Sequence, residues 1–294
     1  MTGLDWASAA ARLGLYAPLV FLFGAFAFPV IFARGSLGGL VMERFRRPIL
    51  PAAILAVLSI AASLPLLAAT IDGDWSGAVD SSTLTVLLAI PNIGLVWVAR
   101  IALAGLLLIW LCFRLAGPSG PFAIATLLLA SLALMGHAVM QEGLIGWFHM
   151  ANHMIHVLAA SLWLGSLPPL LVTLTALRDR ASRAEAMDAL KRFSRVGHGA
   201  VAVVLVTGIV NVWLILGQWP LDWSSLYQLL LATKIALVGL MAATALVNRY
   251  VFTPRIGGNG EAALRNIARG TVVEILLGGS VLALVAVFGL LEPA

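Results

Sequence analysis

Long apolar runs separated by short polar connections make up most of the chain. Eight runs stand out, at residues 12–33, 49–70, 94–113, 122–141, 150–176, 197–217, 227–248 and 271–291. Each has about the 20 residues that an α-helix needs to cross a hydrocarbon core of ~30 Å. Strands of a membrane barrel are shorter and alternate in polarity, so the runs predict helices. We therefore expect an all-α polytopic membrane protein in which eight transmembrane helices form a single transmembrane domain over residues 1–294.

Composition supports this class and excludes several kinds of site. Hydrophobic residues make up 61% of the chain and charged residues only 11%, whereas about a quarter of a soluble domain is charged. The one cysteine, Cys112, lies inside an apolar run, which excludes a disulfide framework and a CxxC site. The sequence contains no GxxxxGK[ST] nucleotide-binding motif, so we do not expect ATP-driven pumping by this chain. We expect a protein that is not an enzyme.

The charges in the connections predict how the chain is oriented. Four connections, at residues 34–48, 114, 178–195 and 249–270, hold 15 of the 18 Lys and Arg residues, and the alternate connections carry acidic residues instead. The positive-inside rule then places both termini on the extracytoplasmic side. The net charge of +5 reflects this topology, and we expect the lipid bilayer, and no nucleic acid, as the surrounding partner.

Two shorter helices are predicted at the membrane surfaces. Residues 81–92 (SSTLTVLLAIPN) have a capping residue at their start and a proline near their end, which predicts a short helix on the outer surface. Residues 179–193 place Ala186, Leu190 and Phe193 on one face of a charged segment. This pattern is typical of an amphipathic helix on the inner surface; a solvated connecting helix is the alternative.

A short internal similarity relates the third and seventh runs. RIALAGL, from Arg100 to Leu106, matches KIALVGL, from Lys234 to Leu240, at five of seven positions. An offset of four helices preserves the direction of crossing, so the match fits a parallel 4+4 duplication.

Apart from Arg12 at the start of the first run, three charged residues fall inside predicted spans. Arg100 and Lys234 each lie six or seven residues below the outer end of their helices. A charge at that depth needs a partner or must extend to the interface, so both are candidates for a functional role. For Glu274 in the last span we expect a structural pairing with Arg265 or Arg269.

The most specific feature is a cluster of histidine and methionine. The chain has five His and eight Met, and eight of these thirteen residues lie within 22 positions. They are Met135, His137, Met140, His149, Met150, His153, Met154 and His156. Such clustering predicts a metal site.

Helical periodicity divides the cluster into two levels. His149, His153 and His156 fall on one face of the fifth helix, and Met150 and Met154 fall on the adjoining face. His149 and His156 are ~10 Å apart along the axis at ~1.5 Å per residue, too far apart to share one ion. We expect a shallow site of His149, Met150 and Met140, and a deeper site of His137 with His153 or His156.

The donor types favour copper. Thioethers and imidazoles without carboxylate or thiolate are typical of Cu(I) sites, with Cu(II) as the alternative, whereas zinc and calcium sites favour other donors. Five further residues are expected to extend or support the path: Arg100, Lys234, Asn211, His198 and Met135. For His198 we expect a structural role, with an exit ligand as the alternative.

Parts of the second half resemble a known family. The runs that carry the resemblance are HVLAASLWLGSLPPLL (156–171), RFSRVGHGAVAVVLVTGIVNVWLILG (192–217) and LLATKIALVGLMAATALVNRYVFTPR (230–255). They are similar to the copper resistance D family, CopD and PcoD, of bacterial inner-membrane proteins. His156 matches the family histidine ahead of Trp163 and Gly165, and His137 in its GHA context resembles the histidine of the preceding helix. The first half matches in helix number more than in motifs.

The resemblance carries expectations about function. It implies eight transmembrane helices and copper uptake across the inner membrane. It also implies cooperation with a separate periplasmic copper-binding protein of the CopC type, since no such domain is fused here. Two other functions stay open from the residues. One is a haem b electron carrier with His137 and a fifth-helix histidine as axial ligands, and the other is a factor that delivers copper to an oxidase.

Overall fold

The structure, a computed structural model, describes residues 1–33, 35–113, 115, 117–257 and 260–293, with the side chains of His137 and Ala138 outside the description. Within these ranges every regular element is a helix. Ten are α-helices: α1 (Gly3–Ile31), α2 (Ser36–Asp72), α3 (Ser81–Ala89), α4 (Val96–Cys112), α5 (Ser119–Ala130), α6 (Gly143–Gly165), α7 (Leu167–Ala176), α8 (Arg183–Leu216), α9 (Leu226–Val247) and α10 (Gly260–Phe288). The all-α prediction is confirmed.

Short 3₁₀ and π segments join or extend these helices. The 3₁₀ segments are η1 (Trp75–Val79), η3 (Ser131–Leu134), η4 (Gly136–Val139) and η6 (Thr253–Gly257), and the π segments are η2 (Pro91–Leu95) and η5 (Asn248–Phe252). Such segments often mark positions where a regular helix is interrupted for a functional reason.

The spanning segments agree with a polytopic membrane protein, although the fourth predicted span is shorter than the other seven. In the described ranges, seven segments are long and apolar enough to cross a membrane, and Ser119–Leu134 is a shorter apolar one. Several helices extend beyond the apolar runs. For example, α1 begins at Gly3 rather than near residue 12, because Thr2 and Asp5 form a capping box at its N-terminus.

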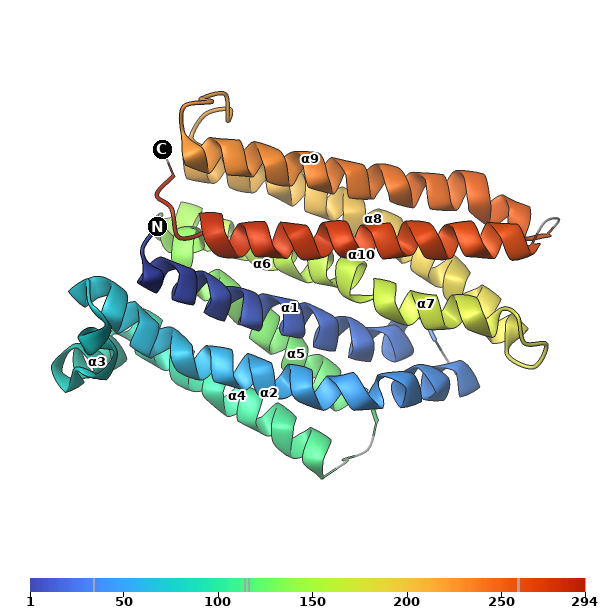
Figure 1. Cartoon of the computed structure of the whole chain (residues 1–294), viewed down its shortest axis with the longest axis horizontal. Helices are drawn as coiled ribbons and strands as arrows, with labels where there is room; N and C mark the ends of the chain where they lie inside the picture. The colour runs from blue at the N-terminus through green and yellow to red at the C-terminus, as the bar shows by residue number, and fades with distance from the viewer. Residues whose placement is uncertain (34, 114, 116, 258–259, 294) are drawn as a thin grey trace.

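The helices lie side by side with the basic connections gathered at one end. Figure 1 places the N- and C-termini together at the opposite end of the bundle. The links from α1 to α2, α7 to α8 and α9 to α10 all lie at the basic end. We call these two ends the terminal end and the basic end.

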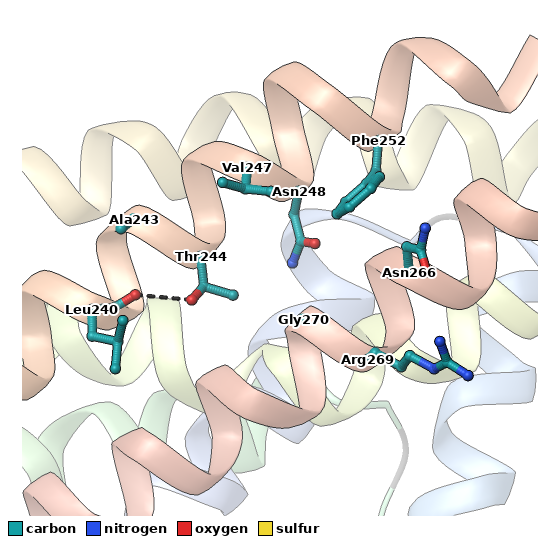
Figure 2. A pocket seen from close by; sticks show the side chains of 9 residues that line it. All are labelled: Leu240, Ala243, Thr244, Val247, Asn248, Phe252, Asn266, Arg269 and Gly270. Carbon is teal, nitrogen blue, oxygen red and sulfur yellow. Dashed lines mark hydrogen bonds between the residues drawn. The ribbon is translucent and has the colours of Figure 1, made fainter.

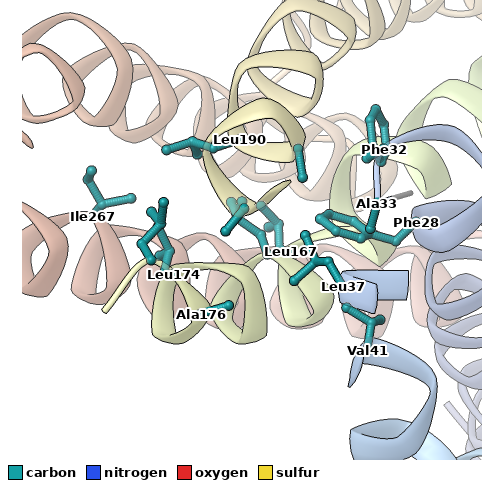
Figure 3. Close-up of a cluster of buried hydrophobic side chains, with 14 of the residues drawn as sticks. Phe28, Phe32, Ala33, Leu37, Val41, Leu167, Leu174, Ala176, Leu190 and Ile267 are labelled. Atoms are coloured by element: carbon teal, nitrogen blue, oxygen red, sulfur yellow. The ribbon is translucent and has the colours of Figure 1, made fainter. Parts of the chain in front are cut away.

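Helix α1 occupies the middle of the bundle. It packs against α2, α5, α6, α7 and α10. Near the basic end, Phe28 of α1 and Phe32 just after it enter a buried cluster with Leu37 of α2, Leu167 of α7 and Leu190 of α8 (Figure 3). Aromatic side chains bury large apolar areas, so this cluster fixes the first, second, seventh and eighth helices relative to one another.

Helices α1 and α6 approach each other closely at a pair of glycines. A Cβ added at Gly24 of α1 would overlap the backbone of Gly165 in α6, and one at Gly165 would overlap Val20 and Gly24. Small residues allow this packing between membrane helices. Gly165 also ends α6, and Pro168 and Pro169 start α7 after a bend at Ser166. The two glycines therefore place the histidine-bearing helix directly on the central helix.

Of the two predicted surface helices, one is present and the other is not. Residues Ser81–Ala89 do form the predicted short helix, capped by Asp80, whose side chain accepts a hydrogen bond from the Thr83 amide at 2.8 Å. The prediction of a separate helix over residues 179–193 was wrong, because α8 runs unbroken from Arg183 to Leu216. Its apolar face, with Ala186 and Leu190, packs inside the bundle instead of lying on a membrane surface.

Candidate metal site

The fourth span is broken where a regular helix over 122–141 was predicted. Helix α5 ends at Ala130, two 3₁₀ segments follow, and Met135 between them is extended. Gly136 and Gly143 have φ angles of 76° and 63°, a region that glycine enters without the strain that other residues incur. The prediction of a regular helix through residue 141 was therefore wrong, and the depths predicted for His137 and Met140 relative to the histidines of α6 stay predictions.

Arg100 of α4 holds the broken segment. Its Nε donates to the Ser131 hydroxyl at 2.9 Å, its Nη2 donates to the Ser131 carbonyl at 2.7 Å, and its Nη1 donates to the Met135 sulfur at 3.3 Å. The side chain is 7% exposed. The guanidinium therefore satisfies a carbonyl that the interruption frees from helical bonding, a requirement in a membrane interior.

His149 lies at the junction of three segments. Its ring is fully buried, and Nδ1 lies 2.5 Å from Oε1 of Gln141. The Gln141 amide nitrogen donates to the carbonyl of Leu214 in α8 at 2.6 Å. The Gln141 oxygen must then accept from Nδ1–H, which makes Nε2 the basic nitrogen of a neutral His149.

His156 has the same arrangement two turns deeper. Its Nδ1 lies 2.9 Å from the Thr207 hydroxyl, and that hydroxyl donates its proton to the Val203 carbonyl at 2.5 Å. Thr207 therefore accepts from Nδ1–H, and Nε2 is again the basic nitrogen. A Cβ added at Gly208 would lie 3.4 Å from Cε1 of His156, so this glycine leaves the ring room against α8.

An asparagine pair joins α6 to α8 between the two histidines. Asn152 donates through Nδ2 to Oδ1 of Asn211 at 2.8 Å and to the Thr207 carbonyl at 3.0 Å. Both side chains are buried. Asn211, which was expected to support the path, lies against α6 and sets the spacing between the helices that carry the two histidines and their partners.

His153 lies beside the deeper histidine. The rings of His153 and His156 are nearly parallel, at an interplanar angle of 17° with centroids 6.5 Å apart. His156 also interacts electrostatically with Lys234 of α9, whose Nζ lies 5.8 Å from the centre of the Phe288 ring. The structure thus brings His153, His156 and Lys234 to the same level of the bundle.

The methionines and the remaining histidines are less closely grouped. Met135 contacts Arg100, Met140 is 50% exposed in the turn before α6, and Met150 and Met154 are half-buried on α6. The side chain of His137 lies outside the described residues. His198 lies nearer the basic end, where Nδ1 donates to the Ser194 carbonyl at 2.7 Å.

Among the side chains that the structure describes, no three from His, Cys, Asp and Glu come together in a metal-binding group. The two-level arrangement of ligands therefore stays a prediction. The structure shows a column of imidazoles along α6. Two of them, His149 and His156, are buried or half-buried, and a neighbouring side chain holds the Nδ1 atom of each.

Comparison with known proteins identifies the family. Residues 3–147 match the model of the N-terminal domain of copper resistance protein D-like proteins, and residues 187–288 match that of copper resistance protein D. Copper resistance protein D of Pseudomonas syringae pv. tomato is 31% identical over 311 aligned positions that cover 98% of this chain and 97% of the relative. The chain belongs to the copper resistance protein D family.

Two further relatives extend the comparison. Inner membrane protein YebZ of Escherichia coli K12 is 32% identical over 92% of this chain and 91% of its own length. Copper transport protein CutJ of Bacillus subtilis 168 is 27% identical over the whole chain but over 55% of its own length. No solved structure matches. This member of the copper resistance protein D family is a copper-related, multi-pass protein of the inner membrane.

Sequence reasoning missed the residues that hold the histidines in place. Gln141, Asn152 and Ser131 are common polar residues with no distinctive spacing. Thr207 and Gly208 form the TG pair of the run 192–217, and their sequence gives no sign that they contact His156. Only packing of α6 against α8 brings these side chains to the imidazoles.

Proposed function

We propose that this protein moves copper across the inner membrane and that the imidazoles of α6 bind the ion on its way. The supporting observation is that Nδ1 of His149 and Nδ1 of His156 both donate to a fixed acceptor, Gln141 and Thr207. Metal-bound histidines usually hold one nitrogen in this way, which orients the ring and leaves the other nitrogen as the ligand. The cargo ligands are then Nε2 of these histidines, joined by His153 and His137.

The methionines determine the ion in this proposal. Met140, Met150 and Met154 lie on the same helix or in the turn before it, at and below its terminal end. Thioethers beside imidazoles favour Cu(I), with Cu(II) as the second form. Half-buried and exposed sulfurs give weak binding at successive positions, which lets an ion move on. The role is transport and involves no catalysis of a chemical reaction.

The charge pattern predicts the orientation of the protein, and inward movement of copper is part of the proposal. The basic connections define the cytoplasmic face by the positive-inside rule, so the termini and the outer end of the histidine column face the periplasm. Copper would enter there, from a separate CopC-type protein, and leave toward the cytoplasm. Alkaline phosphatase fused after the C-terminus is expected to be active, and an inactive fusion of normal abundance would reverse the proposed orientation.

The decisive experiment measures copper in cells and in purified protein. His153→Ala/His156→Ala is expected to reduce both bound copper and copper accumulation by at least about tenfold, because losing only a hydrogen-bond partner of a metal ligand already costs about 10–100-fold. The control is Ile155→Ala, on the same turns of α6 but on an exposed face. Unchanged copper content and accumulation in the double variant would contradict the proposal.

A visible absorption spectrum of the same preparation tests the haem alternative. The copper proposal predicts protein without a Soret band after purification from cells supplied with haem precursor. A stoichiometric Soret band with sharp reduced bands, lost in the His153→Ala/His156→Ala variant, would assign the imidazoles to haem instead.

A further inference from the structure

A buried carboxyl group lies in the middle of the bundle, away from the histidine column. Glu274 is the central residue of α10 and is 3% exposed. Its Oε2 accepts from the indole Nε1 of Trp163 at 3.3 Å, and its Oε1 accepts from Nδ2 of Asn248 at 3.0 Å. Ionisable residues at such positions in membrane proteins usually serve a function.

The expected structural pairing of Glu274 with Arg265 or Arg269 was wrong. In the described ranges the ion pairs are Arg178–Glu261 and Arg265–Glu261, so Arg265 pairs one surface glutamate and Glu274 has no cation within 4 Å. A negative charge held only by two neutral N–H donors is unfavourable in a low-dielectric interior. Protonation of Glu274 to the neutral acid removes the cost of this buried charge. The carboxyl group is therefore suited to binding and releasing a proton.

A cavity extends from Glu274 toward the basic end. A cavity of about 290 Å³ is lined by Glu274, Trp163 and Asn248, and also by His198, Arg249 and Ser194 nearer the basic end. A cavity of this volume holds several water molecules. Its polar groups give those waters hydrogen-bonding partners, which apolar cavities lack.

His198 presents an unused acceptor to this cavity. Because Nδ1 donates to the Ser194 carbonyl, Nε2 carries the lone pair. Nε2 is buried and has no hydrogen-bond partner among the residues that the structure describes. A buried polar atom that lacks a partner often has a functional role. Here Nε2 can bind a proton that arrives from the basic end.

Asn248 separates the cavity from a second hollow. A groove of about 460 Å³ lies between α9 and α10, and Figure 2 shows the Asn248 side chain directed from η5 toward α10 beside Gly270. A Cβ at position 270 would overlap the Asn248 carboxamide, so this glycine lets the amide reach Glu274. A carboxamide both donates and accepts, so it can bond the carboxylate through Nδ2 and the acid through Oδ1.

We propose that Glu274 is a reversible proton-binding site of this protein, reached from the basic end through the cavity with His198 Nε2 as the relay. On protonation, a proton from the basic-side solution binds His198 Nε2, passes through cavity water and forms the O–H bond of Glu274. Release follows the reverse path. His198 keeps its Nδ1 proton on the Ser194 carbonyl throughout.

Few other charges act on this path. The cavity-lining residues with titratable or charged side chains are Glu274 of α10, His198 of α8 and Arg249 of η5, and those from α6, α7 and α9 are uncharged. The Arg249 guanidinium donates to the Ser194 hydroxyl and lies over the Tyr250 ring. The Tyr250 ring also contacts His198 edge-on, with centroids 5.8 Å apart.

Infrared difference spectroscopy of the reconstituted full-length protein, without copper, tests the site. A pH step is expected to produce the C=O stretching band of a protonated carboxyl group that is lost in Glu274→Gln and returns, shifted, in Glu274→Asp. The control Glu261→Gln removes an exposed glutamate of the same helix and leaves the band intact. A band that persists in Glu274→Gln, or no band in the wild type, overturns the site.

Exchange of the band in D₂O tests the relay. His198→Ala is expected to slow the deuterium shift of the Glu274 band severalfold without removing the band. Exchange at the wild-type rate would overturn the role of His198. Proton binding at Glu274 does not require copper as the cargo, so these results and those on copper accumulation can fail independently.

Discussion

Nη2 of Arg100 donates to the carbonyl of Ser131 at 2.7 Å, across the point where the fourth span loses its helical bonding. The same side chain reaches the Ser131 hydroxyl and the Met135 sulfur. The guanidinium therefore satisfies one backbone carbonyl at the interruption and also contacts two side chains of the broken segment. Broken spans in transporters commonly line a binding site, and here the broken segment leads directly into Gln141 and the histidine column.

Arg100→Lys is predicted to destabilise this segment although it keeps the charge. An ammonium group cannot match three acceptors arranged for a planar guanidinium, and an unsatisfied buried carbonyl costs about 1–3 kcal/mol. We expect a lower midpoint of thermal unfolding in detergent and faster proteolysis within residues 131–141.

Lys234→Arg serves as the control for that prediction, because Lys234 lies over an aromatic ring rather than a carbonyl. It should leave both the unfolding midpoint and the cleavage rate near those of the wild type. Equal stability of Arg100→Lys and the wild type would show that the clamp contributes nothing.

Thr207→Val is predicted to weaken copper binding without removing a ligand. The substitution is close in shape but removes the acceptor for Nδ1–H of His156, so the ring is no longer fixed. Loss of such a partner typically lowers metal affinity by about 10–100-fold. Competition titration of the purified protein with a chromophoric Cu(I) chelator measures the change.

Thr233→Val is the matched control, because the Thr233 hydroxyl is exposed and bonds the Leu229 carbonyl of its own helix. It is expected to bind copper as the wild type does. If both threonine variants lost affinity equally, a general loss of helix packing would explain the result better than the His156 contact.

Gly24→Val is predicted to prevent the close packing of α1 on α6. A side chain there would overlap the backbone of Gly165, and a backbone cannot shift as a flexible side chain can. We expect little monodisperse protein after extraction, measured by size-exclusion chromatography of a fluorescent fusion. Gly105→Val, where an added Cβ meets no atom of another described segment within 4 Å, should give a normal peak.

Asn152 and Asn211 are predicted to act as a unit. Each single change to Ala leaves the other amide buried without its partner, at about 1–3 kcal/mol. The double variant should then be less destabilised than the sum of the two single variants. Unfolding midpoints of the wild type, the two single variants and the double variant form a double-mutant cycle. Strictly additive effects would show that the two asparagines do not stabilise the fold through their mutual hydrogen bond.

Several features of the protein could be read from the chain alone. Apolar runs of spanning length determine the class and the eight segments, since only internally bonded helices of that length satisfy the backbone in a bilayer. The concentration of His and Met between Met135 and His156 identified the region of interest, and the runs 156–171 and 192–217 carried the family resemblance that the comparisons confirm.

Tertiary structure decided what surrounds those residues. Periodicity treated the fourth span as a regular helix, whereas α5 ends at Ala130 and Arg100 from another helix bonds the segment that follows. It also assigned Glu274 to a surface arginine, although packing of α6, α9 and α10 encloses that carboxyl with Trp163 and Asn248. Local sequence determines which segments enter the membrane, because hydrophobicity adds up along the chain. The partner of each polar side chain inside depends on contacts between residues far apart in sequence, and only the packed bundle brings them together.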